Sequence, residues 1–495
     1  MQTLDIVVLT IYVAGVVAFG CFFYKRSSTS EGFTSANGRL PGWVVGLSIF
    51  GTYLSSISFL ALPGKAFASN WNAFAFSLSL PFAAYVAVRW FAPLYRSAGD
   101  ISAYAYLERR FGLWARLYAV VCYLLTQFAR MGTILFLVAI AMERLTGWDI
   151  TTIIIVAGIL VTLYTVIGGI EAVIWTDAIQ SAVLTLGALF CAGSIIFDMP
   201  EGPSQLFTIA SNSDKFSLGS FTLSLTDSTF WLVLIYGMFI NLQNFGIDQS
   251  YIQRYHTAKS LAEAQKSIWI GALTYVPVSA LFLFLGSALF SYYTVYPNLL
   301  PENVTGDRVF PYFIATELPP GGAGLLIAAL FAAAMSSIDT SLNSSSTIIQ
   351  SDIYLRFINK TASETQKIKF LRVTTIVMGA AGTACALLMI SIKSALDVWW
   401  SLAGIFSGGM LGLFLLGALS RRTESPQAVT GVIIGILVIV WATFSHNFWF
   451  ALANPFHSLM TTVIGTLAIF FVGMSLSRKN KRRKKGKPAE TLFDL

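Results

Sequence analysis

The sequence predicts an all-α polytopic membrane protein with about 13 transmembrane helices. The first observation behind this prediction is compositional: of 495 residues, 56% are hydrophobic and only 11% are charged. The mean hydropathy of +0.70 excludes an ordinary soluble protein. The second observation is that mostly apolar windows of roughly 18 to 25 residues recur along the chain, each long enough to cross a bilayer.

These windows place the expected helices in order along a single transmembrane domain that fills residues 1–495. No stretch between them has the length and polarity of a soluble domain. The expected spans are 5–23, 43–68, 72–92, 117–142, 150–168, 174–197, 229–246, 268–292, 322–350, 370–392, 396–418, 427–445 and 457–476.

Basic residues set the expected orientation, because Lys and Arg gather in cytoplasmic connections. The first span lacks a basic start and a small-residue cleavage site, so we expect it to be retained with the N-terminus outside. Alternate connections then collect most of the basic residues, and the C-terminus lies on the cytoplasmic side of the cell membrane. The connections expected inside contain Lys25, Arg26, Arg96, Arg109, Arg110, Arg116, Arg254, Lys259, Lys266, Arg356, Lys360, Lys367, Arg421, Arg422 and the basic tail 477–495.

The formal net charge of +8 does not indicate a nucleic-acid partner. Much of the excess lies in the run SRKNKRRKKGK after the last apolar window, which is typical of a cytoplasmic end. The three histidines are scattered at span ends, and the four cysteines lie within expected spans without CxxC spacing. These positions argue against a zinc site and a disulfide framework.

Two expected spans contain a carboxylate within a polar, hydroxyl-bearing stretch, Asp177 within TDAIQS and Asp339 within MSSIDTSLNSSS. An ionisable group inside an apolar span is costly and is a functional hypothesis by default. Both acids lie beside Ser and Thr at helical spacing, an oxygen-rich lining that suits a small hard cation. Hydroxyls can bond back to carbonyls one turn earlier, but that arrangement leaves the Asp339 charge without a counter-ion. A sodium ion would supply one.

The second expected span, 43–68, is poorly built for a plain helix. It contains Gly51, Ser55, Ser58 and Pro63, together with further Gly, Ser and Thr residues. Such a composition favours either an interrupted helix, whose freed carbonyls coordinate a cation, or tight packing through small residues. In the span 322–350, helical spacing places Ala333, Ser336, Ser337 and Thr340 on one face. This second oxygen-rich face favours a cation site, and therefore the interrupted helix.

After Asp177 and Asp339, Arg130 is a third charged residue that we expect at membrane depth. It could pair with Asp177 or Asp339, or its planar fork could bind a carboxylate on a transported solute. We favour the solute role. The aromatic residues Tyr53 and Phe245 are further candidates for a gate or a solute pocket.

Several segments resemble the sodium–solute symporter family, and within it the bacterial sialic acid symporters. The matching segments are SAYAYLERRFG at 102–112, LYTVIGGIEAVIWTDAIQ at 163–180, DQSYIQRY at 248–255, AAAMSSIDTSLNS at 332–344 and SDIY at 351–354.

The resemblance implies a LeuT-type core of ten helices in two inverted five-helix repeats, with the first core helix broken. The repeats would occupy 43–197 and 229–418, preceded by one extra helix at 5–23 and followed by two at 427–476. It implies a first sodium site formed by Gly51, Leu54, Ala333, Ser336 and Ser337. A second sodium site would use Asp177, Ser336, Asp339 and Thr340. Solute binding would involve Ser55, Ser58 and Arg130.

The sequence also departs from that branch at positions near the expected sites. Members carry smaller hydroxyl residues in place of Tyr53, Gln in place of Ser77, and Ser in place of Asp339 and Thr340. Asp339 adds a full charge to the second cation site. Tyr53 and Ser77 reshape the solute pocket, so a related sugar or sugar acid remains open.

The function that the sequence predicts is sodium-coupled import of a small organic solute by alternating access, with sialic acid or a related sugar acid as the leading solute. A neutral sugar, proton coupling through the two acids, a channel and a polytopic membrane enzyme are the alternatives. The absence of a His, Asp or Glu cluster with catalytic spacing argues against an enzyme. The expected partners are sodium ions, the solute and membrane lipid, and we expect the protein to act as a monomer.

Overall fold

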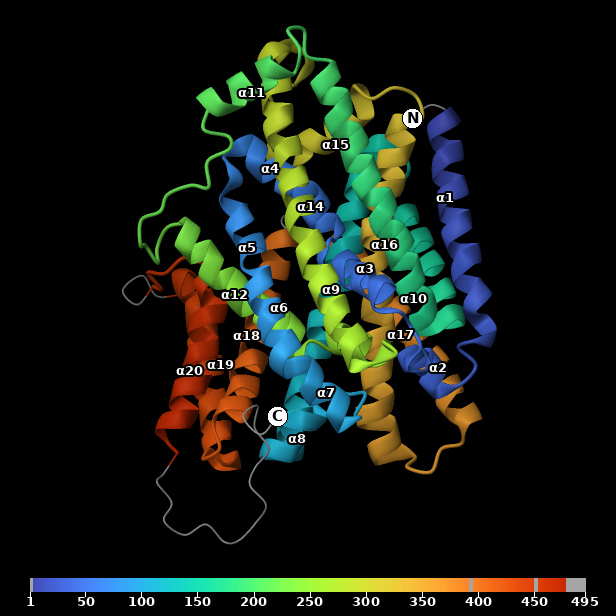
Figure 1. Cartoon of the computed structure of the whole chain (residues 1–495), viewed down its shortest axis with the longest axis vertical. Coiled ribbons are helices and arrows are strands. Elements are labelled where there is room, and N and C mark those ends of the chain that lie inside the picture. The colour runs from blue at the N-terminus through green and yellow to red at the C-terminus, as the bar shows by residue number, and fades with distance from the viewer. Residues whose placement is uncertain (1–2, 391–394, 449–452, 478–495) are drawn as a thin grey trace.

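The computed structural model describes residues 3–390, 395–448 and 453–477, and these residues form a bundle of helices (Figure 1). The only β contact among them is an isolated parallel bridge between Leu40 and Ala258. Short 3-10 or π segments also occur: η1 Phe23–Lys25, η2 Ala36–Gly38, η3 Trp71–Ala73, η4 Ala87–Phe91, η5 Pro297–Leu299, η6 Gly306–Arg308 and η7 Ile349–Ile358. The α-helices are α1 Thr3–Phe22, α2 Ser30–Ser35, α3 Gly42–Tyr53, α4 Ser56–Ala68, α5 Phe74–Leu78, α6 Leu80–Val86, α7 Ala92–Ala98, α8 Ala105–Phe111, α9 Leu113–Thr146, α10 Ile150–Phe197, α11 Pro203–Asn212, α12 Phe230–Ile247, α13 Gln249–Thr257, α14 Leu261–Val295, α15 Val309–Thr316, α16 Gly322–Ile348, α17 Glu364–Met389, α18 Ala395–Leu419, α19 Ser425–Phe448 and α20 Met460–Ser475.

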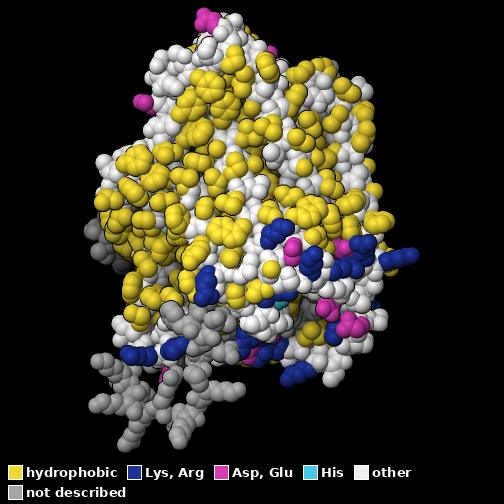
Figure 2. Space-filling view, in the orientation of Figure 1, with side chains coloured by type: hydrophobic (Ala, Val, Ile, Leu, Met, Phe, Trp, Pro, Cys, Tyr) yellow, Lys and Arg dark blue, Asp and Glu magenta, His cyan; other side chains and the backbone are white. Residues whose placement is uncertain are grey.

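The described helices confirm an all-helical polytopic membrane protein. Nine are long and apolar enough to cross a bilayer, or ten when the bent pair α3 and α4 counts as one. Shorter apolar helices span 408–419 and 460–475. Figure 2 shows hydrophobic side chains over most of the visible face, whereas Lys and Arg gather toward the end that contains α2, α7 and α8 in Figure 1.

The interruption expected in the second span is confirmed. Helices α3 and α4 meet at a bend of 55°. Leu54 leaves the helical region with φ −90° and ψ 82°, and Ser55 is extended. The break separates two helices that are each too short to cross a bilayer alone, so the pair forms one broken crossing.

Helix α10 runs through two of the expected spans as a single element of 48 residues. Its length would be about 72 Å if it were straight, more than twice the roughly 30 Å hydrocarbon core. Gly169 interrupts it with φ 60° and ψ −161°, a conformation that an L side chain rarely adopts. A Cβ atom at this position would also lie 3.0 Å from Phe33. Both the backbone conformation and the close packing therefore require glycine.

Helix α1 packs along α10 and α16 at the edge of the bundle (Figure 1). Gly20 permits this approach, because a Cβ atom there would lie 3.0 Å from the Tyr164 side chain. At the other end of α1, the buried Asp5 carboxylate accepts hydrogen bonds from the backbone N–H groups of Gly321 and Gly324, at 2.8 and 2.9 Å. This carboxylate stabilises the N-terminus of α16, where the helix dipole favours negative charge.

Candidate functional site

The break between α3 and α4 changes the hydrogen bonding of the backbone at Gly51. In a continuous helix the Ser55 N–H group would donate to the Gly51 carbonyl. Here it donates to the Tyr53 carbonyl at 3.2 Å. The Gly51 carbonyl is therefore without its regular helical donor, as expected for a cation ligand at a broken helix.

Gly51 lies against the hydroxyl groups of two other helices. A Cβ atom at this position would lie 2.8 Å from Ser181 Oγ of α10 and 3.1 Å from Ser336 Oγ of α16. The structure thus brings together two residues of the predicted first sodium site, Gly51 and Ser336, which are far apart in the sequence. Glycine is needed because a side chain would press on both hydroxyls.

The other predicted members of this site are buried. Leu54 and Ala333 are each 1% exposed, and Ser337 is fully buried on α16. The Ser337 hydroxyl oxygen has no hydrogen-bond partner. A buried hydroxyl oxygen without a partner is available as a ligand for a hard cation.

Asp177 is fully buried on α10 and carries a complete set of partners. One oxygen accepts from Arg254 Nη2 of α13 at 2.9 Å and also from the Ser48 hydroxyl of α3. The other accepts from Ser336 Oγ at 2.5 Å. The carboxylate therefore joins α3, α10, α13 and α16.

Arg254 lies on α13, in the expected connection between α12 and α14, but the structure buries its side chain inside the protein. Its side chain is 1% exposed and donates to Ser48 Oγ, the Ser250 carbonyl, Asp177 and Thr340 Oγ1, over 2.7 to 2.9 Å. Helix α13 is mostly polar in sequence although almost all of its residues are buried, so its sequence pattern resembled a polar loop. The signal that could have found Arg254 is charge balance, since a buried carboxylate demands a buried cation.

Asp339 is fully buried on α16 but has far fewer partners than Asp177. Its Oδ2 atom accepts a hydrogen bond from the hydroxyl of Tyr164 on α10. Its Oδ1 atom has none. The side chain of Asp339 is not hydrogen-bonded to the side-chain network that joins Asp177, Ser336 and Thr340 around Arg254, although Asp177 and Arg254 are close enough to interact with it electrostatically.

Arg130 pairs with neither acid among the described residues. Its Nη2 atom donates to the Thr52 carbonyl at 3.0 Å, one residue before Tyr53. The Asp248 carboxylate at the start of α13 is close enough to interact with it electrostatically. Gln127, one turn earlier on α9, is fully buried with both polar side-chain atoms unpartnered. Arg130 therefore lies at the helix break, and Gln127 offers an unsatisfied polar group one turn away on the same helix.

Aromatic side chains cover the break on the same side as Tyr53. The Tyr53 ring lies 5.7 Å from that of Phe245, 5.0 Å from that of Tyr251 and 5.5 Å from that of Tyr275, between ring centroids. The buried Tyr53 hydroxyl has no partner, and Tyr275 interacts with Ser58. The structure thus brings Tyr53, Ser58 and Phe245 together.

Ser55 and Ser77 are placed less directly. Ser55 is half-buried at the N-terminus of α4. Ser77 is 2% exposed on α5, two residues before Ser79, whose hydroxyl accepts from Asn241 of α12 at 2.9 Å. These contacts join α5 to α12 but do not link Ser77 to the residues at the helix break.

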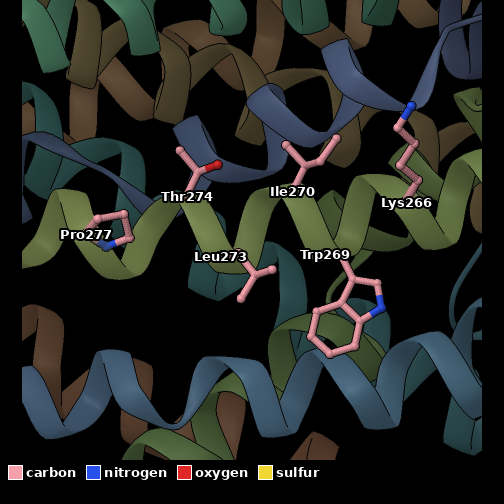
Figure 3. A pocket seen from close by; sticks show the side chains of 6 residues that line it. All are labelled: Lys266, Trp269, Ile270, Leu273, Thr274 and Pro277. Carbon is pink, nitrogen blue, oxygen red and sulfur yellow. The ribbon is translucent and has the colours of Figure 1, made fainter.

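A hollow with a volume of about 660 Å³ lies elsewhere, along α14. Figure 3 shows Trp269 and Leu273 on one side of this helix and Ile270 and Thr274 on the other. None of its lining residues belongs to the predicted sites, and Leu273 is 52% exposed. This hollow is an apolar surface groove on a membrane-spanning helix, so it is not the solute site.

Broken helix, buried hydroxyls and an all-helical bundle define a multi-pass membrane carrier. The model of the sodium:solute symporter family matches residues 33–435. The chain therefore belongs to this family, and it is a sodium-coupled symporter and not an enzyme.

Relatives and solved structures agree with the family assignment. The sodium/sialic acid symporter NanT of Aliivibrio fischeri is 35% identical, over 94% of this chain and 92% of its own length. The sodium/sialic acid symporter SiaT of Proteus mirabilis is 37% identical, over 92% of both chains. The sodium/glucose cotransporter of Vibrio parahaemolyticus is 27% identical, over 96% of this chain and 91% of its own length.

Among solved structures, the substrate-bound outward-open state of a Na⁺-coupled sialic acid symporter matches with a TM-score of 0.90 and 34% identity. It covers 96% of this chain and 98% of the other. The nucleobase-cation symporter Mhp1 in a closed conformation matches with a TM-score of 0.57 and 15% identity, over 90% of this chain and 93% of the other. The second likeness concerns the fold alone.

Proposed function

We propose that this symporter imports sialic acid or a related sugar acid. The observation that carries the proposal is Arg130, a guanidinium at the helix break whose hydrogen bond in this structure is to a neutral carbonyl. A carboxylated solute would offer it a charge-assisted, two-pronged partner in place of that carbonyl. The two bacterial relatives named for sialic acid support this solute class. Tyr53, Ser55, Ser58, Ser77 and Phe245 would line the remainder of the pocket.

The first sodium ion would bind at the helix break. Carbonyl oxygens of Gly51, Leu54 and Ala333 and the hydroxyls of Ser336 and Ser337 would hold it. The closeness of Gly51 to Ser336 and the unpartnered Ser337 hydroxyl support this site. Sodium bound there would join the broken helix to α16 and favour the outward-open state through linkage.

The second sodium site would use Asp177, Ser336, Asp339 and Thr340. Arg254 already neutralises Asp177. The charge left for a second cation is therefore that of Asp339, whose Oδ1 atom is open.

The membrane arrangement is also a proposal. The ten candidate spans, α10 divided at Gly169, and the two shorter apolar helices would make thirteen crossings. Ten of them would form two inverted repeats at 43–197 and 229–418. The end of the molecule with α2, α7 and α8 would face the cytoplasm, because Lys and Arg gather there. The N-terminus would be outside. The expected cytoplasmic tail at 477–495 lies almost wholly outside the described residues. A monomer would suffice for transport, since one chain supplies every residue of these sites.

Uptake into proteoliposomes tests the proposal. Labelled sialic acids and neutral sugars are offered with sodium or potassium outside, at pH values from 6 to 8. We expect sodium-dependent uptake of carboxylated sugars, and loss of that uptake in Arg130→Met.

The matched control is Arg89→Met, which removes an exposed arginine that stacks on Trp90 and should transport like the parent. Equal uptake of a neutral sugar by Arg130→Met and the parent, with no uptake of sugar acids by the parent, would establish a neutral solute instead. Uptake driven by a proton gradient without sodium would contradict the coupling.

A further inference from the structure

Four buried polar atoms without hydrogen-bond partners belong to three residues of neighbouring helices. They are Asp339 Oδ1 on α16, both side-chain polar atoms of Gln180 on α10, and the hydroxyl oxygen of Tyr12 on α1. Gln180 is 1% exposed and Asp339 is fully buried. Buried polar groups in folded proteins nearly always have partners, so a group of orphans requires an explanation.

The contacts of two tyrosines place these atoms in one cluster. The Tyr164 hydroxyl donates to Asp339 Oδ2 and also interacts with Gln180. The Tyr12 hydroxyl interacts with Gln180 and with the charge of Asp339. Tyr12 and Tyr164 therefore flank the same carboxylate and the same carboxamide. The cluster lies where α1 packs against α10 and α16.

An ionised Asp339 would give the cluster a negative charge that no ion pair in the described part of the chain compensates. Among the described residues Asp339 forms no ion pair, whereas Arg254 is engaged by Asp177 and Thr340. A lone carboxylate in a low-dielectric interior is strongly unfavourable, and a neutral hydroxyl donor cannot offset its charge. A water molecule could fill the open hydrogen bonds but would leave the charge unchanged.

We propose that this cluster binds one sodium ion through Asp339 Oδ1, the Gln180 side-chain oxygen and the Tyr12 and Tyr164 hydroxyl oxygens. All of these ligands are oxygens and one is charged, as a hard monovalent cation requires. The proposal rests on the proposed sodium symport, but it replaces Asp177, Ser336 and Thr340 as the partners of Asp339. The ion would lie between Asp339 and α1, because Tyr12 of α1 interacts with this carboxylate.

This position gives α1 a part in coupling. Other described contacts of this helix, such as the close approach of Gly20 to Tyr164 and the hydrogen bonds of Asp5 at the start of α16, are structural. With Tyr12 as a ligand, sodium binding would hold α1, α10 and α16 together. Sodium would then stabilise the folded protein even without solute.

The test is the sodium-induced rise in melting temperature of the purified full-length protein. Sodium chloride is compared with equimolar potassium chloride, without solute. Asp339→Asn, Gln180→Leu and Tyr12→Phe are expected to raise the sodium concentration for half-maximal stabilisation, Asp339→Asn by about tenfold and Tyr12→Phe by roughly threefold. Melting in potassium alone shows whether each variant folds. Tyr104→Phe is the matched control, because it removes another buried, unpartnered tyrosine hydroxyl, from a segment next to α8. It should respond to sodium like the parent.

A parent whose uptake does not depend on sodium would contradict the proposed function. If the parent depends on sodium but all three variants respond to it like the parent, only the cluster site is overturned. A change in Asp339→Asn without any change in Gln180→Leu and Tyr12→Phe would also overturn it, in favour of the set with Asp177. Weaker sodium stabilisation in all three variants, with Tyr104→Phe unaffected, supports the proposal.

Discussion

Asp177 and Asp339 are the same residue type, each fully buried in a membrane-spanning helix, yet their surroundings differ completely. Asp177 has an arginine and two serine hydroxyls around it. Asp339 has one tyrosine hydroxyl and an open oxygen. The first carboxylate is paired with Arg254 and joins four helices. The second, when ionised, would need an external cation as its counter-charge.

The largest expected effect comes from removing the arginine that pairs with Asp177. Arg254→Met leaves the buried Asp177 charge unpaired, which should lower the free energy of unfolding by about 3–5 kcal/mol. Thermal melting in detergent measures the loss. The double variant Arg254→Met/Asp177→Asn should recover most of it, because no unpaired charge remains. A single variant that melts like the parent would show that Asp177 does not depend on Arg254.

A smaller effect is expected from removing the hydrogen bond that Tyr164 donates to Asp339. Tyr164→Phe removes the one hydrogen bond that the Asp339 carboxylate accepts from a side chain in this structure, which should cost about 1.5–3 kcal/mol in potassium if the carboxylate is ionised. Tyr95→Phe is a matched control, since its buried hydroxyl donates to the neutral Gly246 carbonyl at 2.6 Å. It should cost about half as much. Equal losses in thermal melts would mean that Asp339 carries no charge in potassium.

The proposed first sodium site would share Ser336 with the Asp177 network. Gly51→Ala would crowd the hydroxyls of Ser181 and Ser336, and we expect about a tenfold rise in the sodium concentration for half-maximal uptake. Gly193→Ala is the control, because a Cβ atom there meets nothing within 4 Å. Uptake assays over a range of sodium concentrations compare the two. Identical curves would show that Gly51 does not take part in sodium binding.

The smallest effect concerns pH and α13, the helix that carries Arg254 to Asp177. Burial and the neighbouring Arg96 lower the pKa of His256, in the connection between α12 and α14, to about 4, although Asp100 opposes the shift. The unfolded chain protonates near its usual value of about 6.5, so between these values it binds more protons than the folded chain. Stability should therefore be fully present above pH 6.5 and fall as the pH drops toward 4. Melting at pH 5 should come roughly 2–4 °C below that at pH 7.5, and His256→Asn should remove this difference. An unchanged pH dependence in the variant would assign the effect to other groups.

The sequence by itself determined the membrane class, the order of the spans and the broken second span. These properties depend on local composition, because apolar length and the mixture of Gly, Ser and Pro act within one segment. It also placed Ser336, Ser337, Thr340 and Asp339 on adjoining faces of one helix, since helical periodicity is local.

Only the tertiary structure decided which buried charges meet. Arg254 reads as a loop residue until α13 is seen to be enclosed, and Asp177 then has its cation. Tyr12 and Gln180 carry no sequence signal that connects them to Asp339, because they approach it from other helices at large sequence separation. Partners of a buried ion are chosen by packing between helices, and no periodicity within a single helix encodes that choice.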